Sequence, residues 1–417
     1  MIKRIALVLL PLAIIFSSGL SRSSRVEAQF PAAFGAQRAP SIDVDEQGRL
    51  YLLMSVATNT AAANTPGSQI FFTMSKDGGE SWDNTPLTKN LSKSKGEAFG
   101  PSVAVTRSGP AIPYVVYHDT RDVTQVYLLK TKKKTKFKKP INITPHDGGA
   151  FTPKVALDAN GGVNIVWGDT LGGRKQVVFV RSTDQGVTFS SPKGVSEGSD
   201  GAFDPEIAIV PREDSPAGFA IYVVWDDVEQ GQNVIKFSRS LDAGESFSAP
   251  KTLSTRPEAG ESHIAADGSR IHVVWTEETP AGENQAVYSQ SLDGGDTFSE
   301  PIDVSSIRNG EVHKPVVTTF SNTVYIAFNE DARNKQVFLT TSKDGGVSFS
   351  DPVEVSNANP ARGRAHSAAM VVDNEGTLHI VWIDSSVIGL DEGLLFYGNT
   401  SNGSRFGSRK MILAFVG

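Results

Sequence analysis

The chain has 417 residues, no cysteine and a formal net charge of −6, with 46 Asp and Glu against 40 Lys and Arg. The lack of cysteine excludes structural disulfides and the lipid-bearing cysteine of a bacterial lipoprotein. The mildly acidic balance argues against a nucleic-acid-binding surface, so we expect no nucleic-acid partner.

Residues 1–28 are predicted to be a signal peptide. Lys3 and Arg4 precede the apolar run IALVLLPLAIIF, which a proline interrupts and which is too short for a comfortable membrane span. Val26-Glu27-Ala28 offers small residues where cleavage would occur, with an earlier site near Ser17 and an uncleaved anchor as alternatives. We therefore expect an exported protein, secreted or periplasmic, with no stable membrane span after signal cleavage.

A motif of the form Ser-x-Asp-x-Gly-x-x-aromatic recurs along the rest of the chain. Five clear copies cover residues 75–82, 182–189, 240–247, 291–298 and 342–349, and two copies without the aspartate cover 130–137 and 399–406. The seven aromatic residues that end these copies are 51 to 58 residues apart. Such a period is typical of stacked or radial structural units.

Each unit is predicted to hold four short antiparallel strands. In the unit that starts at Pro153, the segment KVAL, a second apolar strand ending at Trp167 and the strand QVVFVRS precede the Asp-bearing turn and a short last strand. Four such strands make a propeller blade. We predict an all-β chain in which an N-terminal segment, 29–39, precedes a seven-bladed β-propeller over 40–417. The blades start near residues 40, 101, 153, 205, 262, 315 and 368.

The aspartates of the repeated turn are expected to be structural. A carboxylate can accept hydrogen bonds from nearby backbone N–H groups, the glycines permit positive φ, and the serine hydroxyl can fix the strand end. Turn chemistry thus explains these residues without catalysis. They are Asp77, Asp184, Asp242, Asp293 and Asp344.

These turns resemble the Asp boxes, or bacterial neuraminidase repeats, of propellers in the sialidase superfamily. The resemblance covers the chain from about Pro40 to its end and implies the propeller fold. Because the same turn occurs in propellers that cleave glycans and in others that only bind, it implies little about chemistry. Gln37-Arg38-Ala39-Pro40 resembles the Arg-Ile-Pro signature of the first sialidase blade, which makes Arg38 the best residue to carry over as a catalytic-site residue.

One set of candidate ligand-binding residues stands two places before each blade start. These side chains should surround the mouth of the ring, where the aromatic ones could stack on a sugar or plug the space between blades. The two histidines could meet, but such pairs more often bind the backbone, and no calcium loop is present, so we predict no metal and no other cofactor. The set includes Arg38, Phe99, Phe151, Phe203, His313 and His366.

A second set is an acidic ring, two places after the aromatic residue of each second strand. Its carboxylates could attract a cationic ligand, or they could cap adjacent loops and pair with nearby arginines. The ring consists of Asp119, Asp169, Asp227, Glu277, Glu330 and Asp384, with Arg121 and Arg333 beside it.

The function that we expect is that of a binding module, which takes a glycan, a peptide or a protein at the mouth of the propeller and has no sialidase activity. The alternative is an exo-acting glycoside hydrolase of the sialidase superfamily. It would use Arg38 for an anionic substrate group and two carboxylates of the acidic ring as the catalytic pair. A third possibility is an assembly platform whose outer surface carries the function.

Overall fold

The structure is a computed structural model of the chain. It describes residues 40–57, 67–83, 89–121, 123–133, 136–199, 201–305, 310–331, 335–356, 365–384, 394–401, 403, 406 and 410–413. The predicted signal peptide, the segment 29–39 with Arg38, and Arg333 lie outside the described residues. The described residues all belong to the unit Gln37–Gly417. Within them, no helix has both the length and the apolar character that a membrane crossing requires.

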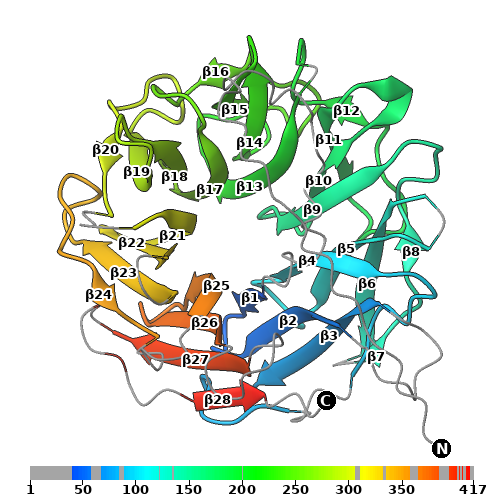
Figure 1. The fold of residues 1–417 in the computed structure, drawn as a ribbon. Coiled ribbons are helices and arrows are strands. Elements are labelled where there is room, and N and C mark those ends of the chain that lie inside the picture. The colour runs from blue at the N-terminus through cyan, green and yellow to red at the C-terminus, as the bar shows by residue number, and fades with distance from the viewer. Residues whose placement is uncertain are drawn as a thin grey trace, which may run out of the picture. The chain divides into compact units, whose positions relative to one another are not determined.

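Seven antiparallel sheets follow one another around a common centre in chain order (Figure 1). The first strand of each sheet lies innermost, and the later strands lie progressively farther out. The only helical element in the described part is a short 3₁₀ turn at Leu171–Gly173. The fold is the seven-bladed β-propeller that the repeats predict.

Blades 3 to 7 each contain the four predicted strands in meander order. Their strands are β9 (Ala150–Leu157), β10 (Val163–Asp169), β11 (Gln176–Ser182) and β12 (Lys193–Gly194); β13 (Phe203–Pro211), β14 (Phe219–Glu229), β15 (Gln232–Ser240) and β16 (Lys251–Thr252); β17 (Gly260–Asp267), β18 (Arg270–Glu278), β19 (Asn284–Ser291) and β20 (Ile302–Asp303); β21 (Val312–Phe320), β22 (Thr323–Glu330), β23 (Gln336–Ser342) and β24 (Val353–Glu354); and β25 (Ala365–Val372), β26 (Leu378–Asp384), β27 (Leu394–Thr400) and β28 (Lys410–Leu413).

The first two blades depart from the four-strand pattern. In blade 1 an isolated bridge between Phe71 and Asn90 stands where a fourth strand would pair. In blade 2 two short strands pair with the third. The strands are β1 (Ser41–Val44), β2 (Leu50–Ala57) and β3 (Ser68–Ser75) in blade 1, and β4 (Ala98–Val105), β5 (Pro113–Asp119), β6 (Gln125–Lys133), β7 (Lys136–Phe137) and β8 (Ile141–Asn142) in blade 2.

The hydrophobic core lies between neighbouring blades. The second strands β5, β10 and β26 are buried at every residue, because the preceding blade covers one face of each blade and the following blade covers the other. One apolar cluster joins Tyr222 and Ile235 of blade 4 to Ile271 and Trp275 of blade 5. Burial on both faces explains why the second strands read as continuous apolar runs rather than as alternating ones.

The repeated turns close the third strand of each clear copy. In blade 4 the Ser240 hydroxyl donates to Asp242 (2.7 Å) and accepts the Gly244 N–H (2.8 Å), and the Ser246 N–H donates to the Asp242 carboxylate (3.0 Å). The other four turns make the same three bonds. Gly244 has φ +86°, and a Cβ there would lie 2.1 Å from the Phe179 ring of blade 3. Only glycine therefore fits this place.

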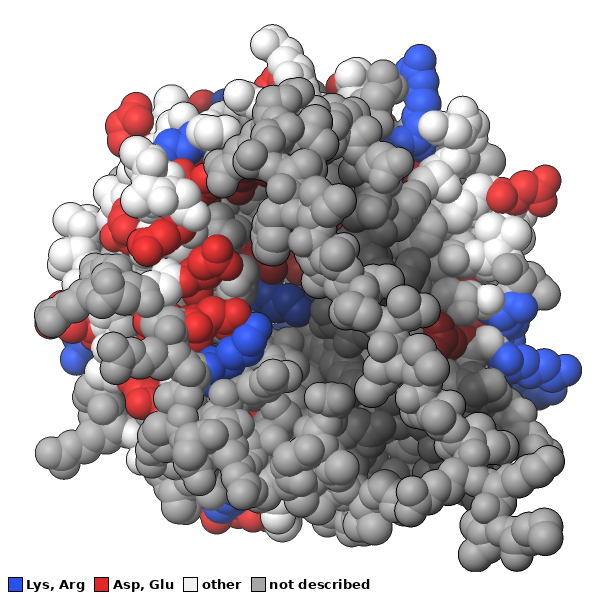
Figure 2. All heavy atoms as spheres, viewed as in Figure 1, with Lys and Arg blue, Asp and Glu red and all other residues white. Residues whose placement is uncertain are grey.

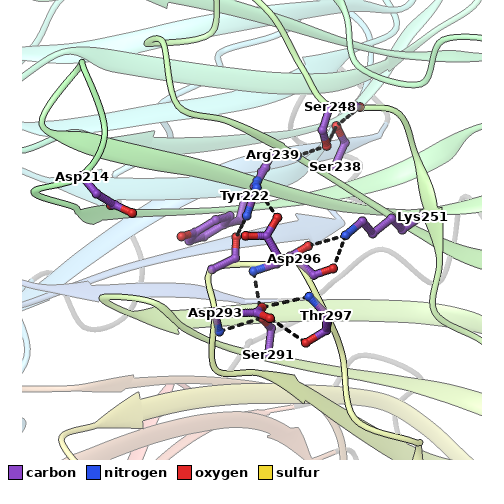
Figure 3. A network of polar contacts seen from close by, with 12 residues as sticks. Asp214, Tyr222, Ser238, Arg239, Ser248, Lys251, Ser291, Asp293, Asp296 and Thr297 are labelled. Carbon is purple, nitrogen blue, oxygen red and sulfur yellow. Dashed lines mark hydrogen bonds and ion pairs between the residues drawn. The ribbon is translucent and has the colours of Figure 1, made fainter.

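Basic side chains of one blade hold the turn of the next blade, as Figure 3 shows for blades 4 and 5. Arg239 donates to the carbonyl oxygen of Gly294 and pairs with Asp296, both at 2.5 Å. Lys251 donates to the carbonyl oxygen of Gly295 at 2.8 Å. These charge-assisted bonds add polar links to the apolar packing between blades.

The first and last blades meet through side chains. A core cluster joins Leu50 and Leu52 of blade 1 to Val381 and Leu395 of blade 7. In the described residues every strand of these two blades pairs within its own sheet. Within the described residues, the first and last blades are thus joined by side-chain packing and share no strand.

Candidate functional site

Carboxylates of the predicted acidic ring lie in the core at the ends of the second strands. Asp227 accepts the Trp225 indole N–H (2.9 Å) and the Ser199 hydroxyl (2.5 Å). Glu277 accepts the Trp275 indole N–H at 2.9 Å. Because Ser199 belongs to the connection that enters blade 4, Asp227 ties this connection to the second strand of the blade.

The same arrangement recurs in blades 2 and 3. Asp119 is fully buried, accepts the hydroxyl of Ser94 on the connection that enters blade 2 (2.7 Å), and pairs with Arg121 through two bonds of 2.7 and 3.1 Å. Asp169 accepts the Trp167 indole N–H at 2.7 Å and lies 3.1 Å from His146, on the connection that enters blade 3. These ring members are occupied in holding the blades to their connections.

The remaining two members of the ring differ from each other. Asp384 is buried at the end of β26. Glu330 is half-buried at the end of β22, and burial, followed by the charges of Asp331 and Glu354, raises its pKa. Sequence position alone does not separate Glu330 from its buried counterparts.

The aromatic residues predicted at the mouth occupy two different settings. Phe99 is only 5% exposed, and its ring and that of Phe151 pack on the buried His118 imidazole, at 5.7 and 6.2 Å between centroids. Phe203 is half-buried at the start of β13. Burial lowers the pKa of His118 to about 4, so the imidazole is neutral in this aromatic packing.

The two histidines of that set have different neighbours. His313 lies 3.5 Å from Glu311, 3.8 Å from Asp331 and 3.9 Å from Glu261. His366 lies 2.9 Å from the hydroxyl of Ser367. Among the described residues, no group of three or more His, Cys, Asp or Glu side chains is arranged to hold a metal ion.

An irregularity in the first strands brings a different set of residues together. In blades 2 to 7 the pairing of the first two strands is interrupted by a bulge, and the residue just before each predicted blade start has φ between +46° and +57°. This conformation costs a residue other than glycine about 1–2 kcal/mol. The six residues are Gly100, Thr152, Asp204, Glu261, Lys314 and Ser367.

Two charged residues of this set, together with Asp226, form contacts that link three blades. The Lys314 backbone N–H donates to the Glu261 carboxylate at 2.6 Å, and the Glu261 N–H donates to Asp226 at 2.7 Å. Burial lowers the pKa of the Lys314 ammonium, which the charges of Glu261 and Asp204 oppose. We refer to Thr152, Asp204, Asp226, Glu261 and Lys314 as the central cluster.

Both aspartates of the central cluster, Asp204 and Asp226, have pKa values raised above the ordinary value. Burial raises the pKa of Asp204, although its side chain stays accessible to solvent, as expected for a group in a hollow. Burial, and then the charge of Asp204, raises the pKa of Asp226 to about 7, against hydrogen bonds from Ser262 and Glu261. At neutral pH the pair therefore carries fewer than two negative charges.

Further polar side chains surround the central cluster. Lys154 forms an ion pair with Glu206 of the next blade, and the half-buried His263 accepts the Val317 N–H at 3.4 Å. Figure 2 shows a face that is hollowed near its centre, with acidic and basic side chains exposed there and further Asp and Glu side chains over β17 to β23. The arrangement offers both donors and acceptors to a polar ligand.

The sequence pattern did not point to the central cluster because the positions that it indicated lie one residue away in the strand register. Residues two places before each blade start were expected at the mouth, whereas the bulge selects the residue one place before. One residue of shift reverses the side of the strand to which a side chain points. A signal was nevertheless present, because Thr, Asp, Glu, Lys and Ser stand at this place in successive repeats.

No protein-family model and no curated protein matches the chain. Among solved structures, the BP39L lectin from Burkholderia pseudomallei is similar, with 13% identity over 90% of this chain and 99% of the lectin and a TM-score of 0.62. A PL25 polysaccharide lyase, an ulvan lyase bound to -[GlcA(1-4)Rha3S]-, has 11% identity over 85% of this chain and 90% of the lyase, with a TM-score of 0.57.

The Hadza microbial sialidase Hz136 has 17% identity over 71% of this chain, with a TM-score of 0.49. The match spans only 63% of the length of that sialidase. At these identities the similarity to the lectin and to the lyase shows the shared propeller fold alone.

Proposed function

We propose that the protein is an exported propeller that binds a glycan at the central cluster. The observation that carries this proposal is the presence of Asp204, Glu261 and Lys314 at left-handed positions of three neighbouring blades. Gly100 shows that glycine fits the equivalent place in blade 2, so the backbone alone does not account for charged residues there. Their side chains, rather than the bulge itself, explain why the strain is kept.

The chemistry of the central cluster suits sugar hydroxyls. Carboxylates such as Asp204 and Glu261 accept hydrogen bonds from hydroxyl groups, and the Lys314 ammonium donates to hydroxyl and ring oxygens. The lectin and the ulvan lyase with the same fold support a glycan rather than a peptide, as their names refer to glycans. The predicted signal peptide supports export, which would bring the site to extracellular glycans.

A glycan array with the purified mature chain, followed by titration calorimetry on the best ligand, tests this proposal. Asp204→Asn keeps a residue that tolerates positive φ, and Glu261→Gln keeps the size of the side chain. Each is expected to weaken binding about tenfold or more, because hydrogen bonds of charged groups contribute roughly 1.5–3 kcal/mol. Glu300→Gln removes an exposed carboxylate beyond the turn of blade 5 and should leave binding unchanged. Equal binding by all these variants would refute the site.

A glycoside hydrolase is the second candidate, and the Asp204–Asp226 pair favours it. A carboxyl group with a pKa of about 7, as in Asp226, suits a general acid. Asp226 is, however, buried and accepts three bonds, from Glu261 N–H and from the N–H and hydroxyl of Ser262. These bonds favour a positioning role and make binding the better-supported function.

The hydrolase candidate is tested with a fluorogenic panel of α-sialosides and neutral glycosides. Turnover that disappears in Asp226→Asn would replace the binding proposal by a hydrolase. The sialidase resemblance assigns an anionic substrate group to Arg38, which lies outside the described residues, so Arg38→Ala belongs in the same panel. An inactive wild-type chain would eliminate the hydrolase.

A further inference from the structure

Positive charge is concentrated in blade 2 and in the chain that enters it. Residues 84–143 contain 12 of the 40 Lys and Arg residues but only 3 of the 46 Asp and Glu residues. The rest of the chain is therefore strongly acidic, although the whole has a net charge of only −6. Figure 2 shows Lys and Arg side chains at the outer rim, over β6 and β8, away from the acidic side chains of blades 5 and 6.

Described lysines of this region gather where β6 turns into β7. The Lys138 N–H donates to the carbonyl oxygen of Lys130 at 2.9 Å. The Lys89 ammonium lies over the Phe72 and Phe137 rings, 5.1 and 5.0 Å from their centroids, which places it beside β7. We refer to Lys89, Lys130, Lys136, Lys138 and Lys139 as the basic edge.

The ammonium groups of the basic edge repel one another. The Lys130 side chain is buried and its ammonium donates to the carbonyl oxygen of Gln185, while burial, followed by the charge of Lys138, lowers its pKa. Lys136, Lys138 and Lys139 are exposed, and no carboxylate in the described part of the chain forms an ion pair with them. Like charges at facing positions of a β-hairpin are destabilising. Lysines at a strand edge also discourage edge-to-edge pairing, and a bound anion would relieve the repulsion that their clustering creates.

We propose that the basic edge binds an acidic polysaccharide, one that carries sulfate or carboxylate groups along its chain. Ammonium groups spread along a hairpin match charges repeated along a polymer better than they match one small anion. Ile141, 40% exposed, is the one large apolar side chain exposed on the described β7–β8 segment, so this segment offers little for insertion into a lipid surface. The proposal is independent of glycan binding at the central cluster.

Binding of the full mature chain to immobilised dextran sulfate and polygalacturonate tests the proposal, with neutral dextran as the reference. The triple variant Lys136→Gln, Lys138→Gln, Lys139→Gln is expected to weaken binding at least about tenfold and to flatten its dependence on salt. The control Lys193→Gln, Lys335→Gln, Lys343→Gln removes the same charge from blades 3 and 6 and should change binding less than about twofold. Thermal unfolding verifies that both variants fold.

Three outcomes would overturn the proposal. Equal weakening by the two triple variants would show a response to net charge alone. Stronger binding to anionic phospholipid vesicles or to duplex DNA than to both polysaccharides would assign the basic edge to a different partner. Loss of dextran sulfate binding in Asp204→Asn, with the triple variant unaffected, would show that the polyanion binds at the central cluster instead.

Discussion

The phenol of Tyr397, in blade 7, donates a 2.8 Å hydrogen bond to the carbonyl oxygen of Gly78, in the turn of blade 1. The ring of Tyr397 also packs on Trp82, with 5.5 Å between centroids. Residues that are 319 positions apart in the sequence are thereby joined. In the described part of the chain, these side chains link the last blade to the first, and no strand there is shared between the two blades.

Two adjacent glycines allow this link to be tested. A Cβ at Gly79 would lie 2.2 Å from the Tyr397 ring, whereas a Cβ at Gly78 would meet nothing within 4 Å, and both residues have positive φ. Gly79→Ala should therefore lower the free energy of unfolding by about 2 kcal/mol more than Gly78→Ala, through the clash alone. Urea denaturation measures the difference. Equal losses would show that the contact with Tyr397 does not limit stability.

Buried histidines predict a loss of stability in mild acid. Burial lowers the pKa of His272 to about 4, and its Nδ1 lies 2.7 Å from the Tyr288 hydroxyl. The unfolded chain, with an ordinary pKa near 6.5, binds the proton first, so stability is full above about pH 6.5 and declines as the pH falls towards 4. His272→Gln should flatten this part of the curve of melting temperature against pH. An unchanged slope would contradict the assignment to His272.

Asp226 predicts the opposite pH dependence. Its pKa of about 7 in the folded state lies above the ordinary value of 3.8, so its contribution is favourable at low pH and is lost as the pH rises from about 4 to 7. Asp226→Asn stays neutral, but its amide N–H₂ would face the N–H of Glu261 or Ser262 at every pH, so the variant should lose clearly less stability relative to wild type at pH 8 than at pH 4. Calorimetric melting at the two pH values measures this.

The neighbouring residue provides a control for Asp226. Asp227 accepts the Trp225 indole at one carboxylate oxygen and the Ser199 hydroxyl and Val228 N–H at the other. In Asp227→Asn an amide N–H₂ would face a donor, so stability should fall at both pH values by roughly 1–3 kcal/mol. Equal behaviour of the two variants would rule out the special role of the Asp204–Asp226 pair.

The strained backbone at the central cluster predicts that glycine is a less destabilising substitution than alanine there, the reverse of the order in a regular strand. Thr152 has φ +46°, so Thr152→Gly should be more stable than Thr152→Ala by about 1 kcal/mol. At Thr319, on the regular part of β21, alanine should instead be the more stable of the two substitutions. Chemical denaturation of the four variants measures both differences. The same order at both positions would show that the bulge carries no strain.

Much of the fold was predictable from the sequence because its determinants are local. The Ser-x-Asp-x-Gly turn forms from residues within one short segment, as Ser240, Asp242 and Gly244 show, and its seven copies determine the number of blades. Continuous apolar runs such as that ending at Trp167 identify the buried second strands. The aspartates of the turns could therefore be interpreted as structural from their spacing alone.

The candidate site could not be predicted in the same way because its determinants lie in other blades. Asp227 resembles a ligand-binding carboxylate in the sequence, and only the folded chain brings Ser199 of the preceding connection to it. A bulge of one residue decides that Lys314, rather than His313, occupies the strained position.

Sequence alone thus determined the repeat, the turn chemistry and the number of blades, which depend on contacts between residues close in the chain. Tertiary structure decided which side chains of the first and last blades meet, which carboxylates are occupied in the core and which charged residues meet at the centre. The physical reason is that each of these contacts joins different blades, as Tyr397 joins Gly78 and Lys314 joins Glu261. Such pairs are set by the packing of whole sheets, which no local pattern of residues encodes.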